Sequence, residues 1–335
     1  MEKYIIRKHH KIKDIAGNKY DKSNYEYTFT TKSGKKIKSH SMSPKLKSYI
    51  KSLKIPPGYK DVKISLNKND KILAIGTDSR ERKQYIYNSE YKLESEDTKY
   101  YNLIEFGRKY NKIMKKINSD LTSSDCIDRE IATVLKIISE CNFRIGNDIY
   151  RDTNNSYGVS TLESKHIKLD GETIDIEFIG KKGVNNRCRF KHRKLSHNLR
   201  RKKKSVRANR SIFNISNSQI NNYLKEFGDF SSKNFRTWNA NIEYIYAIQK
   251  YDIDYDLELS NHKRKIISNK SVSEVAEKLH HTSAVCKKNY IDKQLIELYI
   301  ENKEEFYNIF KIEGNRNKNL IIEQFLKYLK KSFNS

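Results

Sequence analysis

Hydrophobic residues in the first third of the chain alternate with polar ones, which is the pattern of short, half-buried strands. Tyr25, Tyr27 and Phe29 alternate in this way. One helix interrupts the strands, because Ser43 can cap a run with helical spacing that the sequence Pro-Pro-Gly stops at 56–58. The apolar positions of this helix are Leu46, Tyr49, Ile50 and Leu53.

From about residue 97 the apolar residues take up the spacing of helices. We expect two long helices, at 97–121 and 124–141. Turns at Asp170–Gly171 and Gly180–Gly183 then separate short strands within a β segment at 158–190. Further helices are expected at 217–228, 232–250, 272–280, 283–300 and 316–332.

The change of pattern at the charged stretch Glu94–Asp97 divides the chain into two predicted domains. Residues 1–95 form a small β-rich domain, and residues 96–335 form a larger, mainly α-helical domain that contains a short β-hairpin. The predicted fold class is therefore α+β.

The charge of the chain favours a polyanionic partner. Lys and Arg number 68 against 41 Asp and Glu, which gives a net charge of +27. DNA or RNA is the first choice and an anionic membrane surface the second, while the codon bias of an AT-rich genome explains part of the excess. The segment Lys181–Arg210 holds 14 Lys or Arg and no Asp or Glu, which indicates either a DNA-facing segment or a solvated basic loop.

Other features narrow the class of protein. The chain has no run of about 18 apolar residues and no signal peptide, so we expect no membrane segment. The four cysteines are scattered, which excludes a disulfide scaffold and a zinc finger and fits a reducing interior. The histidines show no spacing typical of metal ligands, so no metal is expected.

The chain also contains the residue types that phosphodiester cleavage needs. The protein must place a nucleophile, stabilise charge on the nonbridging oxygens and protonate the leaving oxygen. Arginine matches the geometry of phosphate, lysine can donate the proton, and tyrosine is a nucleophile that needs positive surroundings. Such groups occur in order in Phe143–Asn147 (FRIGN), at Lys181, in Lys233–Trp238 (KNFRTW), in His280–Thr282 (HHT) and at Tyr290.

These motifs resemble those of the poxvirus-type type IB DNA topoisomerases. That family shows Phe-Arg-Ile-Gly, a Gly-Lys hairpin tip, Lys-x-x-Arg-Thr, His-Thr, and a Tyr nine residues after that His. In the N-terminal part, Ile55–Tyr59 (IPPGY) and Gly76–Tyr87 (GTDSRERKQYIY) resemble two further signatures of the family. The resemblance extends from about residue 50 to 295, and the ordered set is far more specific than any one motif.

The resemblance implies an enzyme that cuts and rejoins one strand of duplex DNA as a monomer, without ATP, metal or another cofactor. Tyr290 would attack the phosphodiester and form a 3′-phosphotyrosyl bond. Arg144, Arg236 and His281 would contact the nonbridging oxygens, and Lys181 would be the general acid. Rotation of the free strand before religation would relax supercoils.

The resemblance also implies residues that touch DNA, which form a clamp of the two domains around the duplex. These DNA-binding residues are Arg82, Gln84, Tyr85, Tyr150 and Lys233. The composition favours a large DNA virus as the source, with action in the virion or the host cytoplasm, and a bacterial cytoplasm otherwise.

Some assignments stay open on the sequence. Lys182 shares the predicted hairpin tip with Lys181, and His280 neighbours His281; adjacency to Gly180 favours Lys181, and the nine-residue spacing favours His281. The family usually has Gly where His280 and Asn239 stand, so the local backbone is expected to differ at these two positions.

Two other functions fit part of the pattern. A tyrosine recombinase shares the Arg, Lys, Arg and Tyr set, but recombinases usually have His at the position of Lys233. A non-enzymatic basic DNA-packaging protein would explain the charge but not the ordered catalytic set.

Overall fold

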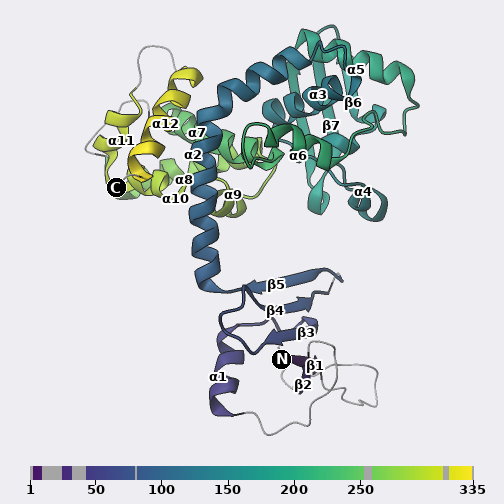
Figure 1. Ribbon diagram of the computed structural model, residues 1–335. Coiled ribbons are helices and arrows are strands. Elements are labelled where there is room, and N and C mark those ends of the chain that lie inside the picture. The colour runs from purple at the N-terminus through teal and green to yellow at the C-terminus, as the bar shows by residue number, and fades with distance from the viewer. Residues whose placement is uncertain are drawn as a thin grey trace. The chain divides into compact units, whose positions relative to one another are not determined.

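The computed structural model describes residues 3–9, 25–31, 43–79, 81–252, 259–311 and 317–333. The chain divides into two compact units, Met1–Lys99 and Tyr100–Ser335. The first unit contains an antiparallel sheet, and the second is mainly helical with a small sheet of its own (Figure 1). The expected α+β class is confirmed.

The N-terminal unit is built on a five-stranded sheet of order β2-β1-β3-β4-β5, in which each neighbouring pair is antiparallel. Its core consists of apolar side chains from alternate strand positions and from one helix, among them Ile5, Ile64 and Ile50. The Ser43 side chain caps that helix by accepting from the Leu46 N–H, as expected. The elements are β1 (Lys3–His9), β2 (Tyr25–Thr31), α1 (Pro44–Ser52), β3 (Lys60–Ser65), β4 (Ile72–Thr77) and β5 (Lys83–Tyr87).

A long helix, α2 (Ser89–Asp120), begins eight residues before the predicted start at 97. The Asn88 side chain accepts a hydrogen bond from the Glu90 N–H at 2.9 Å and so caps the helix start. The Glu90 carboxylate also lies at the positive end of the helix dipole. The charged stretch at 94–97, which we expected to join two domains, is therefore part of one continuous helix.

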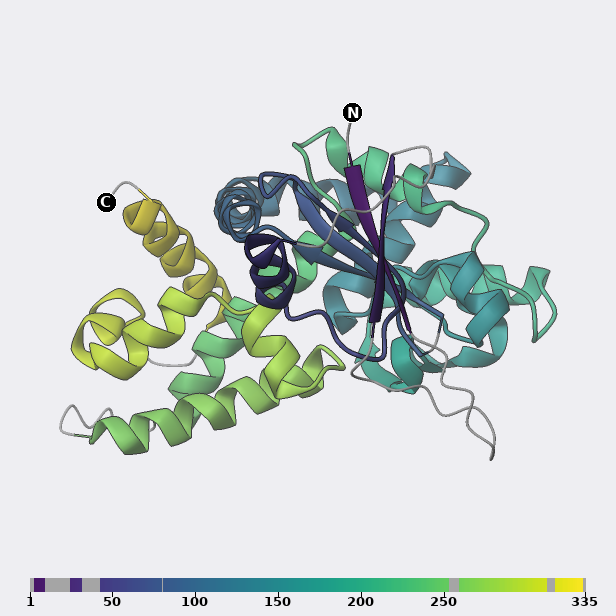
Figure 2. The same ribbon diagram turned by 90° about the horizontal axis from the view of Figure 1, so that it is seen from below.

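The C-terminal unit surrounds a core to which α3 and α7 contribute many fully buried side chains. Figures 1 and 2 both show β6 and β7 beside α3 and α5 at one end of the unit, and α8 and α10–α12 at the other. The strands form a sheet of order β6-β7-β8. The elements are α3 (Cys126–Cys141), α4 (Asp148–Asn154), β6 (Ile167–Asp170), β7 (Thr173–Ile179), β8 (Asn185–Lys191), α5 (Arg193–Ser205), α6 (Asn217–Lys225), α7 (Ser232–Tyr251), α8 (Asn261–Lys278), α9 (Ser283–Asn289), α10 (Lys293–Glu301), α11 (Lys303–Ile309) and α12 (Lys318–Phe333).

Aromatic rings fix α7 within this core. The Phe106 ring of α2 meets the rings of Phe230 and Phe235 edge to face, with centroids 5.4 and 5.1 Å away. Gly107 permits the close approach of α2 to Trp238, because a Cβ atom there would lie 2.5 Å from the indole ring. The first turns of α7, which carry Arg236, are thereby held in a rigid position.

Two predicted helices differ from the observed ones. The helix expected at 272–280 is the end of α8, whose polar first half hides its periodicity. The helix expected at 283–300 is two helices, because α9 ends at Asn289 and α10 begins at Lys293. The Asp292 side chain caps α10 by accepting from the Gln294 N–H at 3.0 Å. Tyr290 therefore lies between two helices rather than within one.

Candidate active site

Tyr290 follows directly after α9, with φ −125° and ψ −38°, and only 8% of the residue is exposed. Its N–H donates to the Cys286 carbonyl at 3.0 Å. The fully buried Asn241 side chain of α7 donates from Nδ2 to the Tyr290 carbonyl at 3.0 Å, and its Oδ1 accepts from the Asp292 N–H at 2.7 Å. The backbone on both sides of the Tyr290 ring is thus attached to α7.

His281 lies beside Tyr290. Its Nε2 atom is 3.2 Å from the Tyr290 hydroxyl oxygen, and the two ring centroids are 4.9 Å apart. The His281 N–H donates to the Ala276 carbonyl at the end of α8, and the next residue, Thr282, caps α9. The short connection between α8 and α9 therefore holds the imidazole ring above the tyrosine hydroxyl.

Arg144 comes from a different part of the chain, the segment that follows α3. Its Nη2 atom lies 2.8 Å from His281 Nε2. A guanidinium group can only donate, so Nε2 is the acceptor and the imidazole is neutral. Burial lowers the pKa of His281 to about 3, helped by the positive charges of Arg144 and Arg236. Burial also lowers the pKa of the Arg144 guanidinium.

Arg236 is the most buried member of the group, with 2% of the residue exposed. Its two terminal nitrogens donate to the carbonyls of Asn142 and of Leu279, which precede Arg144 and His281 by two residues each. Its guanidinium carbon also lies 5.3 Å from the centroid of the Tyr290 ring. Burial lowers the pKa of Arg236 to about 10. One arginine therefore binds all three segments that supply the site.

His280 takes a different direction from its neighbour. Its ring packs on Phe143, with centroids 5.0 Å apart. Its φ of 55° is in the left-handed region that glycine favours, so the backbone at His280 has a conformation that the Gly usual in the family could also adopt. Burial lowers its pKa to about 4. Of the two adjacent histidines, His281 is the one that contacts both Arg144 and Tyr290.

Lys181 opens the short turn Lys181–Gly183 between β7 and β8, at the hairpin tip where the sequence placed it. Both Lys181 and Lys182 are exposed, and Lys182 adopts a left-handed φ of 66°. The positive charge of the Lys181 ammonium contributes to the lowered pKa of His281. The Lys181 charge therefore acts electrostatically on His281, which belongs to the cluster of Arg144, Arg236, His281 and Tyr290.

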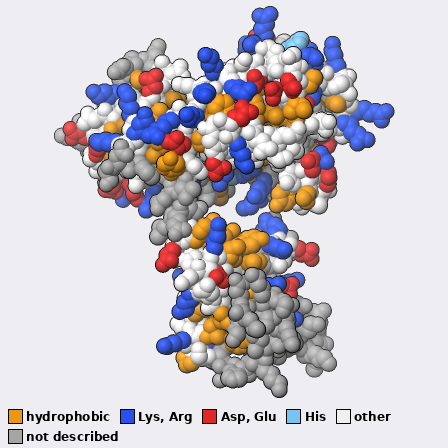
Figure 3. All heavy atoms as spheres, viewed as in Figure 1, with side chains coloured by type: hydrophobic (Ala, Val, Ile, Leu, Met, Phe, Trp, Pro, Cys, Tyr) orange, Lys and Arg blue, Asp and Glu red, His pale blue; other side chains and the backbone are white. Residues whose placement is uncertain are grey.

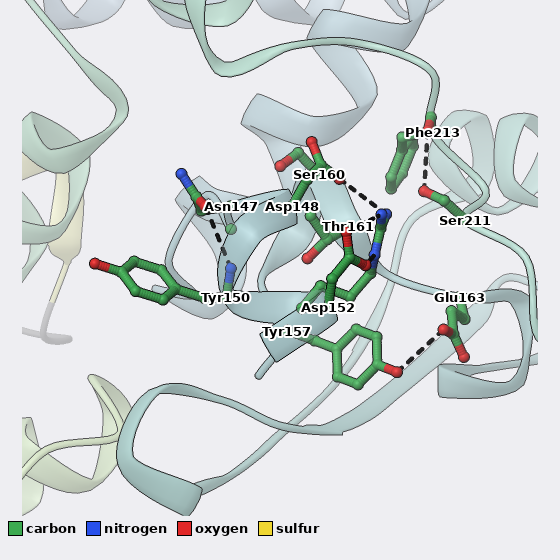
Figure 4. Close-up of polar contacts among 12 residues, drawn as sticks. Asn147, Asp148, Tyr150, Asp152, Tyr157, Ser160, Thr161, Glu163, Ser211 and Phe213 are labelled. Atoms are coloured by element: carbon green, nitrogen blue, oxygen red, sulfur yellow. Dashed lines mark hydrogen bonds and ion pairs between the residues drawn. The ribbon is translucent and has the colours of Figure 1, made fainter. Parts of the chain in front are cut away.

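Of the expected DNA-binding residues, Tyr150 and Lys233 lie in the C-terminal unit. Tyr150 is on α4, 57% exposed, and Figure 4 shows its phenol pointing away from the other labelled side chains. The Asn147 side chain caps α4 by accepting from the Tyr150 N–H at 3.3 Å. Lys233 is exposed in the first turn of α7, three residues before Arg236.

The other three expected DNA-binding residues, Arg82, Gln84 and Tyr85, lie in the N-terminal unit. Asp78 binds two of them, accepting from Arg82 Nη2 at 2.7 Å and from Gln84 Nε2 at 2.9 Å. Tyr85 on β5 is 44% exposed and stacks on Tyr87, with ring centroids 6.1 Å apart. In Figure 3, hydrophobic side chains gather over the part of the N-terminal unit where Figure 1 labels β4 and β5.

The basic segment Lys181–Arg210 contains β8 and the helix α5. The helix was not predicted from the sequence. Lys and Arg side chains gather over α5 in Figure 3. Part of this charge has internal partners, because Lys202 binds the buried Glu130 and Lys203 donates to the carbonyls of Ser164 and Ile167. The segment is thus neither wholly a loop nor wholly free to bind DNA.

Two residues that shape the site could not be identified from the sequence. Asn241 is one polar residue among many in α7, and only the fold brings it to Tyr290. Asn142 caps the C-terminal end of α3 in the left-handed conformation, with φ 55°. Its carbonyl oxygen accepts a hydrogen bond from Arg236. Across the described ranges, no group of three or more His, Cys, Asp or Glu is arranged to hold a metal ion. None of the described helices is long and apolar enough to cross a membrane.

Comparison with known proteins agrees with this arrangement. Residues 88–315 match the family model of the eukaryotic DNA topoisomerase I catalytic core, and residues 26–78 match that of the bacterial DNA topoisomerase IB N-terminal domain. The chain is 30% identical over 272 residues to the DNA topoisomerase 1B of Acanthamoeba polyphaga mimivirus, covering 77% of this chain and 81% of that protein. It is 25% identical over 235 residues to the DNA topoisomerase 1B of Vaccinia virus (strain Copenhagen), covering 68% and 72%. The chain therefore belongs to the type IB DNA topoisomerases, enzymes whose substrate is DNA.

Proposed function

We propose that the protein relaxes supercoiled duplex DNA by cutting one strand through Tyr290 and rejoining it, without ATP or a metal ion. The observation that carries this proposal is the position of Tyr290, whose hydroxyl lies 3.2 Å from His281 Nε2 and whose ring centroid lies 5.3 Å from the Arg236 guanidinium carbon. A tyrosine between a neutral imidazole and a buried cation suits in-line attack on a phosphodiester.

In the forward step the Tyr290 hydroxyl loses its proton to water, its oxygen forms a bond to phosphorus, and the bond from phosphorus to the 5′ oxygen breaks. Arg144 and Arg236 stabilise the charge on the nonbridging oxygens, and His281 donates one hydrogen bond there. The Arg144 donor that now rests on His281 Nε2 turns to the phosphate, which is a stronger acceptor. Once Nε2 is released, the neutral imidazole can change tautomer by exchanging its Nδ1 proton with water, so that Nε2 carries the N–H that donates to the phosphate.

Lys181 protonates the departing 5′ oxygen, so that the cut strand ends in a neutral hydroxyl. Its support is its place at an exposed turn whose charge reaches His281. The 3′-phosphotyrosyl bond conserves the energy of the phosphodiester, and attack by the 5′ hydroxyl reverses each step. Rotation of the free strand between the two steps removes supercoils.

The two units both bind the duplex in this proposal. Residues 1–95 form a DNA-binding domain that contacts DNA through Arg82, Gln84 and Tyr85, and residues 96–335 form the catalytic domain, to which Tyr150 and Lys233 belong. The protein acts as a monomer, since each catalytic residue comes from the same unit of one chain. Because the relatives named above come from large DNA viruses, we place its action in the virion or the host cytoplasm.

Relaxation of a supercoiled plasmid with EDTA present and ATP absent tests the proposal. The intact chain should relax the plasmid, and Tyr290→Phe should bind DNA equally well but neither relax it nor form a covalent adduct. Tyr101→Phe, which removes an exposed hydroxyl from α2, is the matched control and should remain active. Relaxation by Tyr290→Phe, or a dependence on metal or ATP in the intact chain, contradicts the proposal.

A further inference from the structure

Two cysteines 47 residues apart are joined by a disulfide bond. Cys141 is the last residue of α3 and is buried, and Cys188 lies in the middle of β8 and is half-buried. The remaining cysteines, Cys126 and Cys286, are free thiols. The scattered cysteines led us to expect no structural disulfide. That expectation was wrong, because the spacing of cysteines does not tell which segments meet in space. The bond links the end of α3 to the middle of β8.

On one side the disulfide is attached to the segment that carries Arg144. Cys141 precedes Arg144 by three residues, and the intervening Asn142 carbonyl accepts from Arg236. The Phe143 ring, two residues after Cys141, also packs on the ring of His280, which precedes His281, with centroids 5.0 Å apart. A shift of Cys141 would consequently be passed to the residues that contact Tyr290.

On the other side the disulfide is attached to the hairpin that carries Lys181. Cys188 pairs with Ile176 of β7, and this ladder continues to the pair of Ile179 and Asn185 beside the turn. Non-covalent contacts also hold the hairpin, including the edge-to-face rings of Phe143 and Phe178, whose centroids are 4.8 Å apart. The turn itself is exposed, so the position of Lys181 depends on how firmly its two strands are anchored.

We propose that the Cys141–Cys188 disulfide positions the Lys181 hairpin against the Arg144 segment, so that reduction of this bond slows expulsion of the 5′ strand. The inference rests on the proposed role of Lys181 as general acid. A general acid must lie within about 3 Å of the leaving oxygen, and a displacement of about 1 Å can cost roughly 100-fold in rate. Cys141 and Cys188 are positioning residues, because neither contacts the reacting atoms.

The bond can be opened by thiol–disulfide exchange. A dithiol attacks one sulfur, both cysteines leave as thiols, and the reagent is oxidised to its cyclic disulfide, so two electrons pass to the protein. Of the two bonded cysteines, Cys188 is the less buried residue. The same exchange makes the leaving-group step responsive to the redox state of the surroundings.

The experiment separates positioning from overall stability by changing the leaving group. Single-turnover cleavage is measured on a duplex with the ordinary 5′ oxygen and on one with sulfur at that bridging position. A thiolate leaves without a proton donor, so a defect in the general acid disappears on the sulfur duplex. The intact chain is compared before and after treatment with dithiothreitol, beside Cys188→Ser, Cys126→Ser and Lys181→Ala. Thiol alkylation counts the free cysteines in each sample, and thermal unfolding verifies that each is folded at the assay temperature.

Reduction and Cys188→Ser should each slow cleavage of the oxygen duplex about tenfold and leave the sulfur duplex unaffected. Cys126→Ser, which removes an exposed free thiol from α3, should behave like the intact chain on both duplexes and keep its response to dithiothreitol. Four alkylated cysteines before reduction overturn the proposal, as does an equal loss on both duplexes. If Lys181→Ala is not rescued by sulfur, the proposed role of Lys181 is wrong; if it is rescued but the reduced chain is not, only the disulfide inference fails.

Discussion

The carboxamide of Asn241 holds the backbone of Tyr290, donating to its carbonyl at 3.0 Å while also donating to the Thr237 carbonyl one turn earlier in α7. Its oxygen accepts from the Asp292 N–H, beyond the gap between α9 and α10. Tyr290 therefore takes its position from the helix that carries Arg236. Tyr290 and Arg236 are thus attached to the same helix.

This relationship predicts the effect of Asn241→Ala. The substitution leaves the Tyr290 carbonyl and the Asp292 N–H without their partner, which costs about 1–3 kcal/mol of unfolding free energy for each buried group. The misplaced hydroxyl should slow single-turnover cleavage by roughly 100-fold at unchanged DNA affinity. Asn289→Ala, at the exposed end of α9, is the matched control and should cleave normally. Wild-type cleavage by Asn241→Ala would show that Tyr290 is positioned by other contacts.

The two lysines at the hairpin tip should differ in their effects on the leaving-group step. Lys181→Ala should slow cleavage of an ordinary duplex by roughly 10²–10⁴-fold, the usual contribution of a general acid. Lys182→Ala should change the rate little, because Lys181 directly follows Gly180 and its charge contributes to the lowered pKa of His281. Single-turnover rates of covalent adduct formation measure both. The reverse order of effects would assign the proton transfer to Lys182.

The lowered histidine pKa values predict how stability depends on pH. The pKa is about 4 for His280 and about 3 for His281 in the folded chain, against about 6.5 in an unfolded one. As the pH falls, the unfolded chain binds these protons first. Stability is thus present in full above about pH 6.5 and is lost as the pH falls from there toward 4 and 3. Burial lowers the pKa of His166 and His192 in the same direction.

Urea unfolding between pH 7.5 and 5 measures this loss. The window lies above the pKa of Glu274, which is about 2, so its ion pairs with Lys250 and Lys278 do not titrate there. His280→Asn tolerates the left-handed backbone and removes one of the titrating groups, so its free energy of unfolding should fall less steeply with falling pH. Parallel curves for the two proteins would mean that His280 is not held neutral by the fold.

Local features of the fold could be predicted from the sequence. The cap at Ser43, the end of α3 before Arg144 and the turn at Lys181 all depend on residues close in the chain. The break at Tyr290 could not be predicted, because apolar residues continue through Ile291 at helical spacing. The break is stabilised by Asn241, about 50 residues away. A local pattern carries no signal for such a partner.

The same reason explains the two larger errors. Helix α5 has 13 residues, of which Leu195 and Leu199 are the only hydrophobic ones, so its buried stripe is too narrow for periodicity to reveal. The disulfide joins Cys141 to Cys188, and nothing in their separation indicates that α3 and β8 are neighbours. Five site residues could be proposed because the resemblance supplied their order, whereas Asn241 and Asn142 emerged only from the contacts.

The basic segment 181–210 contains two kinds of lysine, and they should respond differently to neutralisation. Lys191 and Lys204 are exposed, whereas the half-buried Lys203 donates to the Ser164 and Ile167 carbonyls, and burial lowers its pKa. If Lys191 lies on a phosphate, Lys191→Gln removes one counterion-releasing contact. The slope of log K against log salt then becomes shallower by about 0.9, with a similar loss of affinity for every DNA sequence.

Lys203→Met should instead leave that slope unchanged and lower the unfolding midpoint, because two buried carbonyls lose their donor. Filter binding across a range of salt concentrations, combined with thermal unfolding, measures both effects. An unchanged slope for both Lys191→Gln and Lys204→Gln would show that these exposed charges do not reach DNA. A changed slope for Lys203→Met would show that its internal hydrogen bonds open on binding, so that α5 rearranges when it meets the duplex.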